Sequence, residues 1–402
     1  MTEARRYQAP TWQQELLLKA ALVDGPNGIA AWTQWRASVD PEQLDYDSYR
    51  LLPLLYDALQ KRGVVDREMG RFKGVYRRTW YDNALRFHAG ATALRALHDA
   101  GITTMLLKGA ALTLRYYGDA GLRPMDDFDI LVPTARGPEA LDVLKGIGWT
   151  PVSDLVGITE AEALAMAHAY PLRNARDQTV DLHWHVFYQH VHPAADDDFW
   201  GAARPIALSG QETLALSPAD QLLHVCVHGT ERAWWGGERA PNLRWVTDAA
   251  MILRSASQEL DWERLLRHAH RLRYVLPMRE ALAYLHDIFG AQVPATALTR
   301  IHTVPVRAAE RIAERARTRP SKLWGPWVAL GVGYLEYCST LPPDAGMLTR
   351  LAGLASFFRR RWGGAPLWQL PFVAIFRGLR RIRWAVEGHR RGHVEITSDT
   401  PP

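Results

Sequence analysis

The sequence predicts an α+β fold, in which a small mixed sheet with helices is flanked by helical regions on both sides. Three observations predict it. Apolar residues recur at helical spacing over residues 11–100, short apolar runs at 102–107, 128–132 and 179–187 look like strands, and helical spacing returns after residue 212. The 402 residues, 48% hydrophobic and 23% charged, are enough for two or three domains with cores of their own.

The composition argues against several classes of protein. Cys226 and Cys338 are far apart in apolar surroundings, which argues against a disulfide framework or zinc knuckle and fits a reducing cytoplasm. The first residues lack a signal-peptide core, and no window of about 18 uncharged apolar residues predicts a membrane span. The formal net charge of +5 comes from an arginine-rich composition, so it gives no strong nucleic-acid signal. We therefore expect a cytoplasmic protein.

Residues 1–100 are expected to form a helical amino-terminal region. Helical spacing is clear at 16–21 and 49–59, and breaks are expected at Gly25 and Pro26 and again at Asp40 and Pro41. From residue 66 to 100 the pattern continues for about nine turns. The simplest role for this region is to pack against the sheet.

The predicted core, residues 101–207, opens with a strand, a turn and a helix. The strand is 102–107, Gly109 is at the turn, and the helix covers 110–117. A glycine at this turn lets a phosphate approach the backbone, and the amides that open the helix, beginning at Ala110, point toward it. Lys108 adds a positive charge in a chain that has only six lysines. These residues are therefore candidates for phosphate binding.

The next strand, 128–132, is preceded and entered by carboxylates. Because strand residues alternate between faces, Asp127 and Asp129 project together while Phe128 and Ile130 point into the sheet. Two carboxylates on one face can hold Mg²⁺ or Mn²⁺. Asp126 should face away by the same alternation.

A later strand, 179–187, brings further polar residues to one face. Between the two strands we expect a helix at 135–147, a short strand at 148–152, a helix at 160–169 and a strand at 170–175. In 179–187, alternation puts Asp181, His183 and His185 on one face. Asp181 is therefore a candidate for a third carboxylate of the site, and His183 for contact with a phosphate or an acceptor.

This ordered set of motifs resembles the polymerase-β-like nucleotidyltransferase superfamily, and more narrowly its uncharacterised nucleotidyltransferases. The resemblance covers about residues 70–255, where His228 and Asp248 also match positions that tend to be histidine and aspartate. One departure is Ala110, because many superfamily members have serine after the glycine, and its absence removes one hydroxyl from the turn. The motifs are Leu107-Lys108-Gly109, Arg123, the acidic strand 127–132, and a strand ending in His183-Trp184.

The resemblance implies metal-dependent transfer of a nucleoside monophosphate from a nucleoside triphosphate, with ATP as the favoured donor, to an unidentified small molecule, peptide or protein. Asp127 and Asp129 would hold Mg²⁺ or Mn²⁺, and Asp181 would complete the metal shell or accept the proton of the acceptor. Arg123 would be a phosphate clamp or a salt-bridge partner that positions the strand of Asp127. The alternatives are a metal-dependent glycosyltransferase, which also uses an acidic-x-acidic pair, and a nucleotide-binding module without turnover.

Other polar and aromatic clusters have structural alternatives. The acidic run 196–198 is expected to be a solvated turn or a helix start rather than a metal site. His190 and His192, with the histidines of 183 and 185, lack the partners of a zinc site and are expected to be structural or at the surface. The loop 234–237, Trp-Trp-Gly-Gly, is either a platform for a base or sugar or an anchor for its own loop.

Residues 208–320 are expected to form a helical carboxy-terminal domain, with helical pattern from Glu212 on. Residues 321–402 form a basic aromatic extension. Within it, apolar residues at helical spacing alternate with arginines over 372–384, which predicts binding to an anionic membrane surface or an acidic partner; the alternative is packing against the core with the arginines solvated. The tail after Gly392 is predicted to be disordered.

Overall fold

A computed structural model of the chain describes residues 10–152, 167–188, 194–231, 243–290, 293–318 and 346–361, and isolated positions at 164, 190, 191, 331, 333, 334, 337, 338, 341 and 368. The chain divides into two compact units, Met1–Val152 with Ala167–Thr340, and Ser153–Met166 with Leu341–Pro402. Several predictions lie outside the described residues. They concern most of the helix at 160–169, His192, the loop 234–237, the stretch 372–384 and the tail.

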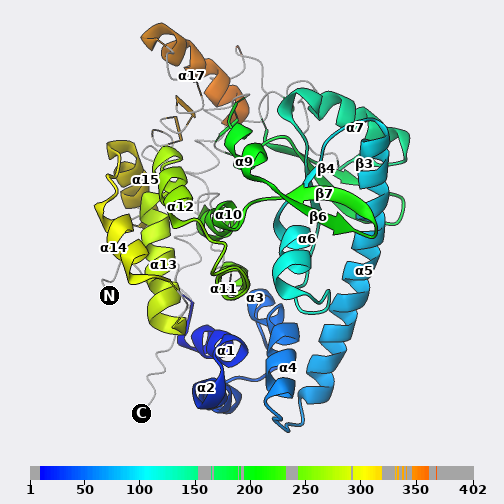
Figure 1. Cartoon of the computed structure of the whole chain (residues 1–402), viewed down its shortest axis with the longest axis vertical. Helices are drawn as coiled ribbons and strands as arrows, with labels where there is room; N and C mark the ends of the chain where they lie inside the picture. Colours follow the sequence, from blue (N-terminus) through cyan, green and yellow to red (C-terminus); the bar gives the residue numbers. More distant parts are fainter. Residues whose placement is uncertain are drawn as a thin grey trace, which may run out of the picture. The chain divides into compact units, whose positions relative to one another are not determined.

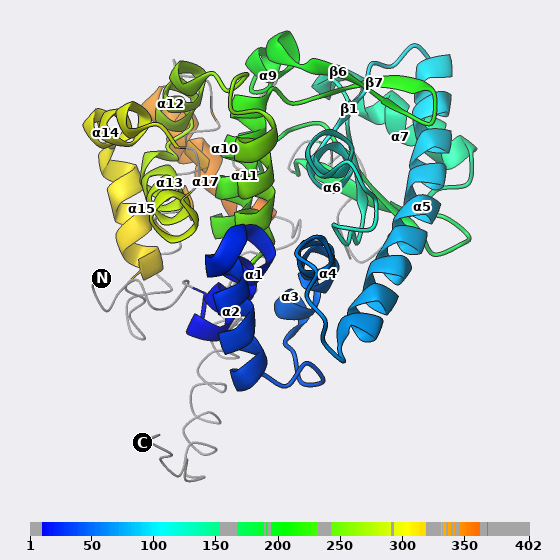
Figure 2. The same ribbon diagram turned by 60° about the horizontal axis from the view of Figure 1, so that its bottom comes forward.

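The amino-terminal region is helical, as predicted. Its helices are α1 (Trp12–Leu22), α2 (Gly25–Ser38), α3 (Tyr46–Tyr49), α4 (Leu52–Lys61) and α5 (Met69–Asp99). Helix α1 begins with a capping box, in which the side chains of Thr11 and Gln14 each accept a hydrogen bond from the other residue's backbone amide. Helix α1 packs against α4 and α11 (Arg244–Ser255) (Figure 2).

A mixed seven-stranded sheet follows, with the order β3-β4-β5-β2-β1-β7-β6. The pairs β2–β5 and β1–β7 are parallel, and the other neighbours are antiparallel. The expected mixed sheet with flanking helices is therefore confirmed. The strands are β1 (Met105–Leu106), β2 (Phe128–Leu131), β3 (Thr150–Pro151), β4 (Ala169–Arg173), β5 (Thr179–His183), β6 (Arg204–Leu208) and β7 (Gln211–Ala215).

The two faces of the sheet pack into different apolar clusters. On one face, Phe128 and Ile130 pack with apolar residues of α5 and of α7 (Gly137–Gly146). On the other face, Met105, Leu107 and Leu131 belong to a cluster that also contains residues of α1, α4 and the carboxy-terminal helices. Figure 1 shows α5 along the sheet, with α10 and α11 on the other side of α6 (Lys108–Leu112). Residues 105–107 alternate between the clusters, as a strand requires.

The carboxy-terminal helices begin later than predicted. The pattern from Glu212 predicted helix, but Gln211–Ala215 is strand β7, which pairs with β6 and β1. Ser209 and Gly210 both have positive φ and form the two-residue turn that joins β6 to β7. The partner β1 lies about a hundred residues earlier, beyond the reach of a local pattern. Helix α9 (Asp197–Ala202) precedes β6, and the helices after β7 are α10 (Pro218–Glu231), α11, α12 (Trp262–Arg271), α13 (Val275–Phe289), α14 (Ala295–Thr303) and α15 (Ala308–Thr318).

The second unit is described mainly through α17 (Met347–Arg361). Its apolar side chains Met347, Leu348, Leu351 and Leu354 are exposed. In the part of the chain that the structure describes, no helix combines the length and the apolar character that crossing a bilayer needs.

Candidate functional site

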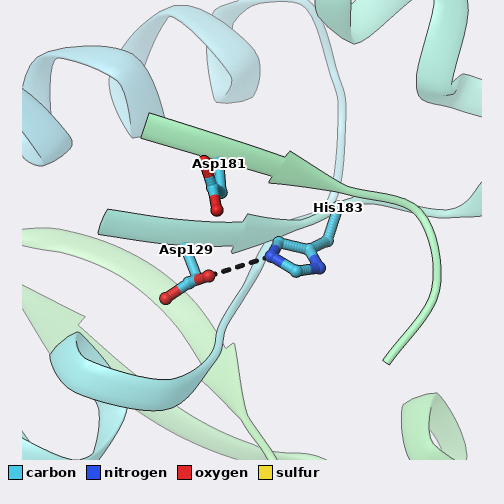
Figure 3. A group of neighbouring side chains, drawn as sticks. All are labelled: Asp129, Asp181 and His183. Carbon is cyan, nitrogen blue, oxygen red and sulfur yellow. Dashed lines mark hydrogen bonds and ion pairs between the residues drawn. The ribbon is translucent and has the colours of Figure 1, made fainter. Parts of the chain in front are cut away.

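Strands β2 and β5 bring three predicted site residues together. The strands are parallel neighbours in which Asp129 lies opposite Asp181, and His183 is two residues further along β5 (Figure 3). All three side chains lie on the face opposite Phe128 and Ile130, as period-two alternation predicts. One ligand atom from each of Asp129, Asp181 and His183 lies within 4.8 Å of the others.

Asp129 is the centre of this group and is fully buried. Its Oδ1 accepts a hydrogen bond from Nζ of Lys108 at 2.5 Å and lies 2.9 Å from Nε2 of His183. Its Oδ2 is buried and has no hydrogen-bond partner among the described residues. Burial alone would raise the pKa of Asp129, but Lys108 and His183 hold it well below its ordinary value. The carboxylate is therefore ionised and half satisfied.

The surrounding charges are unbalanced. The charge of Asp129, followed by burial, raises the pKa of Asp127 to about 6. Burial and then Asp129 raise the pKa of Asp181 as well. Burial opposes the charge on Lys108, yet Asp129 and Asp127 raise its pKa overall. Lys108 thus lies near three carboxylates, Asp129, Asp127 and Asp181, a cluster of negative charge that a divalent cation would stabilise.

The turn before α6 differs in detail from the prediction. Lys108, rather than Gly109, has a left-handed backbone conformation, with φ of 40°. Such a conformation in a residue other than glycine costs about 1–3 kcal/mol and is often found at functional sites. A Cβ on Gly109 would lie 2.9 Å from Nη1 of Arg123 and from Sδ of Met125, so this glycine is also needed for packing.

Ala110 has a packing explanation too. Its methyl group is fully buried and belongs to the apolar cluster beneath the sheet. The residues that line the neighbouring pocket do not include it. A serine hydroxyl in this orientation would point into the core, so the departure from the Gly-Ser pattern leaves the backbone amides of the turn as the available donors.

A pocket of about 70 Å³ lies beside the turn. This is enough for a phosphate group or a hydrated ion, whereas pockets for whole small-molecule ligands hold about 300–1,000 Å³. Its lining includes the turn, the segment that enters β2, and residues of α10 and α11. The glycine of the turn and the polar or charged residues are Lys108, Gly109, Arg123, Asp126, Asp127, His224, His228, Arg244 and Asp248.

Arg123 forms a buried ion pair across this pocket. Its Nε and Nη2 donate to the two carboxylate oxygens of Asp248 on α11, at 2.7 and 2.8 Å. The hydroxyl of Tyr117 donates to the same carboxylate at 2.8 Å. Of the two roles predicted for Arg123, this geometry supports that of a salt-bridge partner. Its Nη1 lies beside Gly109.

Other predicted residues fall outside the group, among them Asp127, which lines the neighbouring pocket. Asp126 is half exposed and pairs with Arg50 and Arg244, and it lines the same pocket as Asp127, so the prediction that it faces away is wrong. His185 is buried, and its Nδ1 lies 2.6 Å from Oδ2 of Asp196. The prediction that Asp196 is solvated is therefore wrong: its carboxylate is buried because it binds the ring of His185 and the backbone amide of Val186. Asp197, by contrast, begins α9 and is exposed.

The pocket also contains two residues that the sequence reasoning missed. His224 precedes His228 by four residues on α10, and Arg244 precedes Asp248 by four on α11. Residues four apart on a helix share a face. This spacing was the signal in the sequence that could have identified His224 and Arg244, because His228 and Asp248 were already matched to family positions.

All the site residues lie in the part of the chain that matches a known protein family. A model of the family described as uncharacterised nucleotidyltransferase matches residues 47–290, which is more than half of the chain. The chain belongs to this family of nucleotidyltransferases. The family predicted from the motifs is thereby confirmed, and the matched range contains β1, β2, β5, α10 and α11.

Two solved structures are more distantly similar to this nucleotidyltransferase. One is the antibiotic-resistance factor ANT(2'')-Ia, with 14% identity over 49% of this chain and 97% of that one, and a TM-score of 0.32. The other is an antigenic nucleotidyltransferase-like protein from Paracoccidioides brasiliensis, with 17% identity, coverage of 56% and 94%, and a TM-score of 0.33. No curated protein sequence matches the chain significantly.

Proposed function

We propose that this nucleotidyltransferase transfers a nucleoside monophosphate from a nucleoside triphosphate, with ATP as the favoured donor, to a hydroxyl of a small molecule, peptide or protein. The observation that carries the proposal is the placement of the neighbouring carboxylates Asp129 of β2 and Asp181 of β5 near Lys108 at the strand-to-helix turn. Acidic residues that bind metal and a basic turn that binds phosphate are the two parts that such a transfer needs.

The residues present fit a divalent cation. Asp127, Asp129 and Asp181 are the proposed ligands, and Oδ2 of Asp129 is a buried oxygen without a hydrogen-bond partner among the described residues. Carboxylate oxygens suit Mg²⁺ and Mn²⁺. When bound, the cation would neutralise charge that develops on the attacking and leaving oxygens.

The protein's own groups would hold the triphosphate. The ammonium group of Lys108 can donate a hydrogen bond to a phosphate oxygen. The amides of Gly109 and Ala110 at the start of α6 are further donors on the same turn. Arg244 and His228 face the pocket from the opposite helices and add positive or donating groups. Arg123, held by Asp248, supports the wall between them.

In the proposed reaction, the acceptor hydroxyl oxygen forms a bond with the α-phosphorus. The bond between that phosphorus and the oxygen bridging to the β-phosphate breaks, and pyrophosphate leaves with its electron pair. Asp181 either completes the metal shell or accepts the hydroxyl proton, since it lies directly beside Asp129 on the neighbouring strand.

The first test is thermal unfolding of the purified protein with ATP, GTP, CTP, UTP and UDP-sugars, each with and without Mg²⁺. A ligand at a hundred times its Kd stabilises the folded state by about 2.7 kcal/mol. We expect a Mg²⁺-dependent rise in Tm with a nucleoside triphosphate, lost in Asp129→Asn and kept in Asp197→Asn, whose carboxylate is exposed on α9. A shift with a UDP-sugar alone would favour a glycosyltransferase, and no shift with any nucleotide would contradict the proposal.

Transfer is tested next with triphosphate labelled at the α-phosphate and candidate acceptors. Label that moves to an acceptor with matching pyrophosphate release supports turnover. Nucleotide binding without release of pyrophosphate for any acceptor would instead favour a binding module.

A further inference from the structure

We propose that His183 is a metal ligand, so that the centre combines an imidazole nitrogen with carboxylate oxygens and selects a transition-metal ion such as Mn²⁺ over Mg²⁺. The inference rests on the proposed function for the presence of a divalent cation. It goes further by adding a nitrogen ligand to the carboxylate oxygens and by naming the class of metal ion that a nitrogen ligand favours.

The separations between the side chains fit a shared ion. Nε2 of His183 lies 2.9 Å from Oδ1 of Asp129. In an octahedral shell with bonds of about 2.1 Å, adjacent ligand atoms are about 3.0 Å apart and opposite ones about 4.2 Å. The ligand atoms of Asp129, Asp181 and His183 all lie within 4.8 Å of one another, so movements below about 1 Å would bring them into one shell.

The same group contains buried polar atoms without hydrogen-bond partners among the described residues. His183 is buried, and its Nδ1 has no hydrogen-bond partner among the described residues, as is true of Oδ2 of Asp129. Buried polar atoms are nearly always paired in folded proteins, and those that are not are often found where an ion binds. A cation held by Nε2 of His183 would lie beside Asp129 and could satisfy its Oδ2, whereas Nδ1 points away from Asp129 (Figure 3) and is not explained by that ion.

His183 is also held in place for this role. It ends β5 beside β2, and Leu131 is its partner in the register of the two strands. The ring packs edge-on against that of His168, with the ring centroids 5.2 Å apart. A rigid strand position reduces the cost of ordering a ligand, which is a requirement for a selective metal site.

The donor set determines which ion is preferred. Carboxylate oxygens alone suit Mg²⁺, Ca²⁺ and Mn²⁺, whereas imidazole nitrogen favours the first-row transition metals. A site with one imidazole should therefore bind Mn²⁺ more tightly relative to Mg²⁺ than the same site with an oxygen in its place. The variant His183→Asn makes that replacement, because its amide is neutral and offers an oxygen in place of the ring nitrogen.

The test uses Mn²⁺ as the probe and electron paramagnetic resonance as the readout. Titration gives the Kd for Mn²⁺, competition gives that for Mg²⁺, and pulsed spectra show whether a nitrogen is bonded to the Mn²⁺. We expect nitrogen coupling in the wild type and in His88→Asn, whose side chain is exposed on α5. In His183→Asn the coupling should be lost, and the preference for Mn²⁺ over Mg²⁺ should fall about tenfold.

Several results would overturn the inference. They are Mn²⁺ bound without nitrogen coupling in the wild type, coupling that survives in His183→Asn, and an unchanged preference for Mn²⁺. The first would make His183 a positioning residue for Asp129. If His183→Asn does not fold, as judged by circular dichroism, His183→Gln provides the same replacement with a longer amide.

This outcome can be separated from that of the proposed function. Nucleotidyl transfer supported by Mg²⁺, together with Mn²⁺ spectra that lack nitrogen coupling, would keep the function and reject the ligand. Nitrogen-coupled Mn²⁺ in a protein that binds no nucleoside triphosphate would keep the ligand and reject the function.

Discussion

Lys108 places its ammonium group where a cation would contact Asp129. Its Nζ is 2.5 Å from Oδ1 of Asp129 and 3.5 Å from Nε2 of His183, so it competes with a metal for the same atoms. We expect Lys108→Met to tighten Mn²⁺ binding to the nucleotide-free protein by at least about tenfold, since a nearby positive charge is removed. Titration followed by electron paramagnetic resonance measures this.

The control for this prediction is Lys73→Met, which removes an exposed lysine from α5. It should leave the Kd for Mn²⁺ unchanged. Weaker or equal Mn²⁺ binding by Lys108→Met would show that the ammonium does not compete with the metal.

His224 makes the stability of the protein sensitive to acid. Burial, with the nearby Lys108 and His183, lowers its pKa from 6.5 to about 3. Below pH 6.5 the unfolded chain takes up a proton that the folded protein does not, so stability is full above pH 6.5 and is lost as the pH falls toward 3. Each pH unit is worth about 1.4 kcal/mol, which gives a loss of about 2 kcal/mol between pH 6.5 and 5.

Urea unfolding across this pH range checks the effect. The variant His224→Gln should lose most of that pH dependence, while His88→Gln, at an exposed position on α5, should keep it. Equal slopes in His224→Gln and the wild type would assign the acid sensitivity to other groups.

At this scale, the sequence predicts residues whose placement depends on local geometry. Asp129, Asp181 and His183 could be placed on one face because strand alternation is a property of neighbouring residues. For Arg123 the sequence left two roles open, because its salt-bridge partner Asp248 is 125 residues away. Asp196 was misplaced for the same reason: its partner His185 lies on another segment.

At the scale of the elements, α5 and β2 are in close contact at Gly90. A Cβ there would come within 2.4 Å of the ring of Phe128, which lies between Asp127 and Asp129 in the chain. Gly90→Ala should therefore destabilise the protein by about 1–2 kcal/mol net, because overpacking exceeds the gain of up to about 1 kcal/mol in helix propensity. Urea unfolding measures the change.

Helix α5 supplies its own control. Gly74 lies in the same helix, and a Cβ there would have nothing within 4 Å. Gly74→Ala should stabilise the protein by about 0.5–1 kcal/mol through helix propensity alone. If both substitutions raised stability equally, the contact between α5 and Phe128 would not limit the packing.

The long helix and the strand β7 show what a pattern can predict about elements. Helix α5 extends over 31 residues, so many repeats of the helical period support it. Strand β7 has five residues and is held between β6 and β1, and its pairing with β1 depends on residues about a hundred positions away. The turn at Ser209 and Gly210 was the one local sign of the hairpin.

At the scale of the whole chain, the first compact unit contains parts of three predicted regions. Apolar residues of α1 and α4, one face of the sheet and helices α10–α14 form one cluster. The fold class could be predicted because each region has its own periodicity. Their shared core could not, because amphipathic patterns show which residues are buried without showing what covers them.

The ion pair between Arg123 and Asp248 links two of these regions inside that unit. Both side chains are buried, and the hydration that they lose offsets much of the attraction between them. The pair stabilises the fold mainly because neither charge is buried without a counter-charge. We expect Asp248→Asn to lower the free energy of unfolding by about 3–5 kcal/mol, because the guanidinium of Arg123 stays buried without a counter-charge.

A double-mutant cycle tests this explanation. Arg123→Met with Asp248→Leu removes both charges, and the double variant should recover most of the stability that Asp248→Asn loses, as measured by urea unfolding. The Mn²⁺ site should survive in the double variant, since neither residue belongs to the group formed by Asp129, Asp181 and His183. If the double variant were as unstable as the sum of its single variants, the pair would act through packing against Tyr117 and Gly109 rather than through charge, and the link between the turn and α11 would be steric.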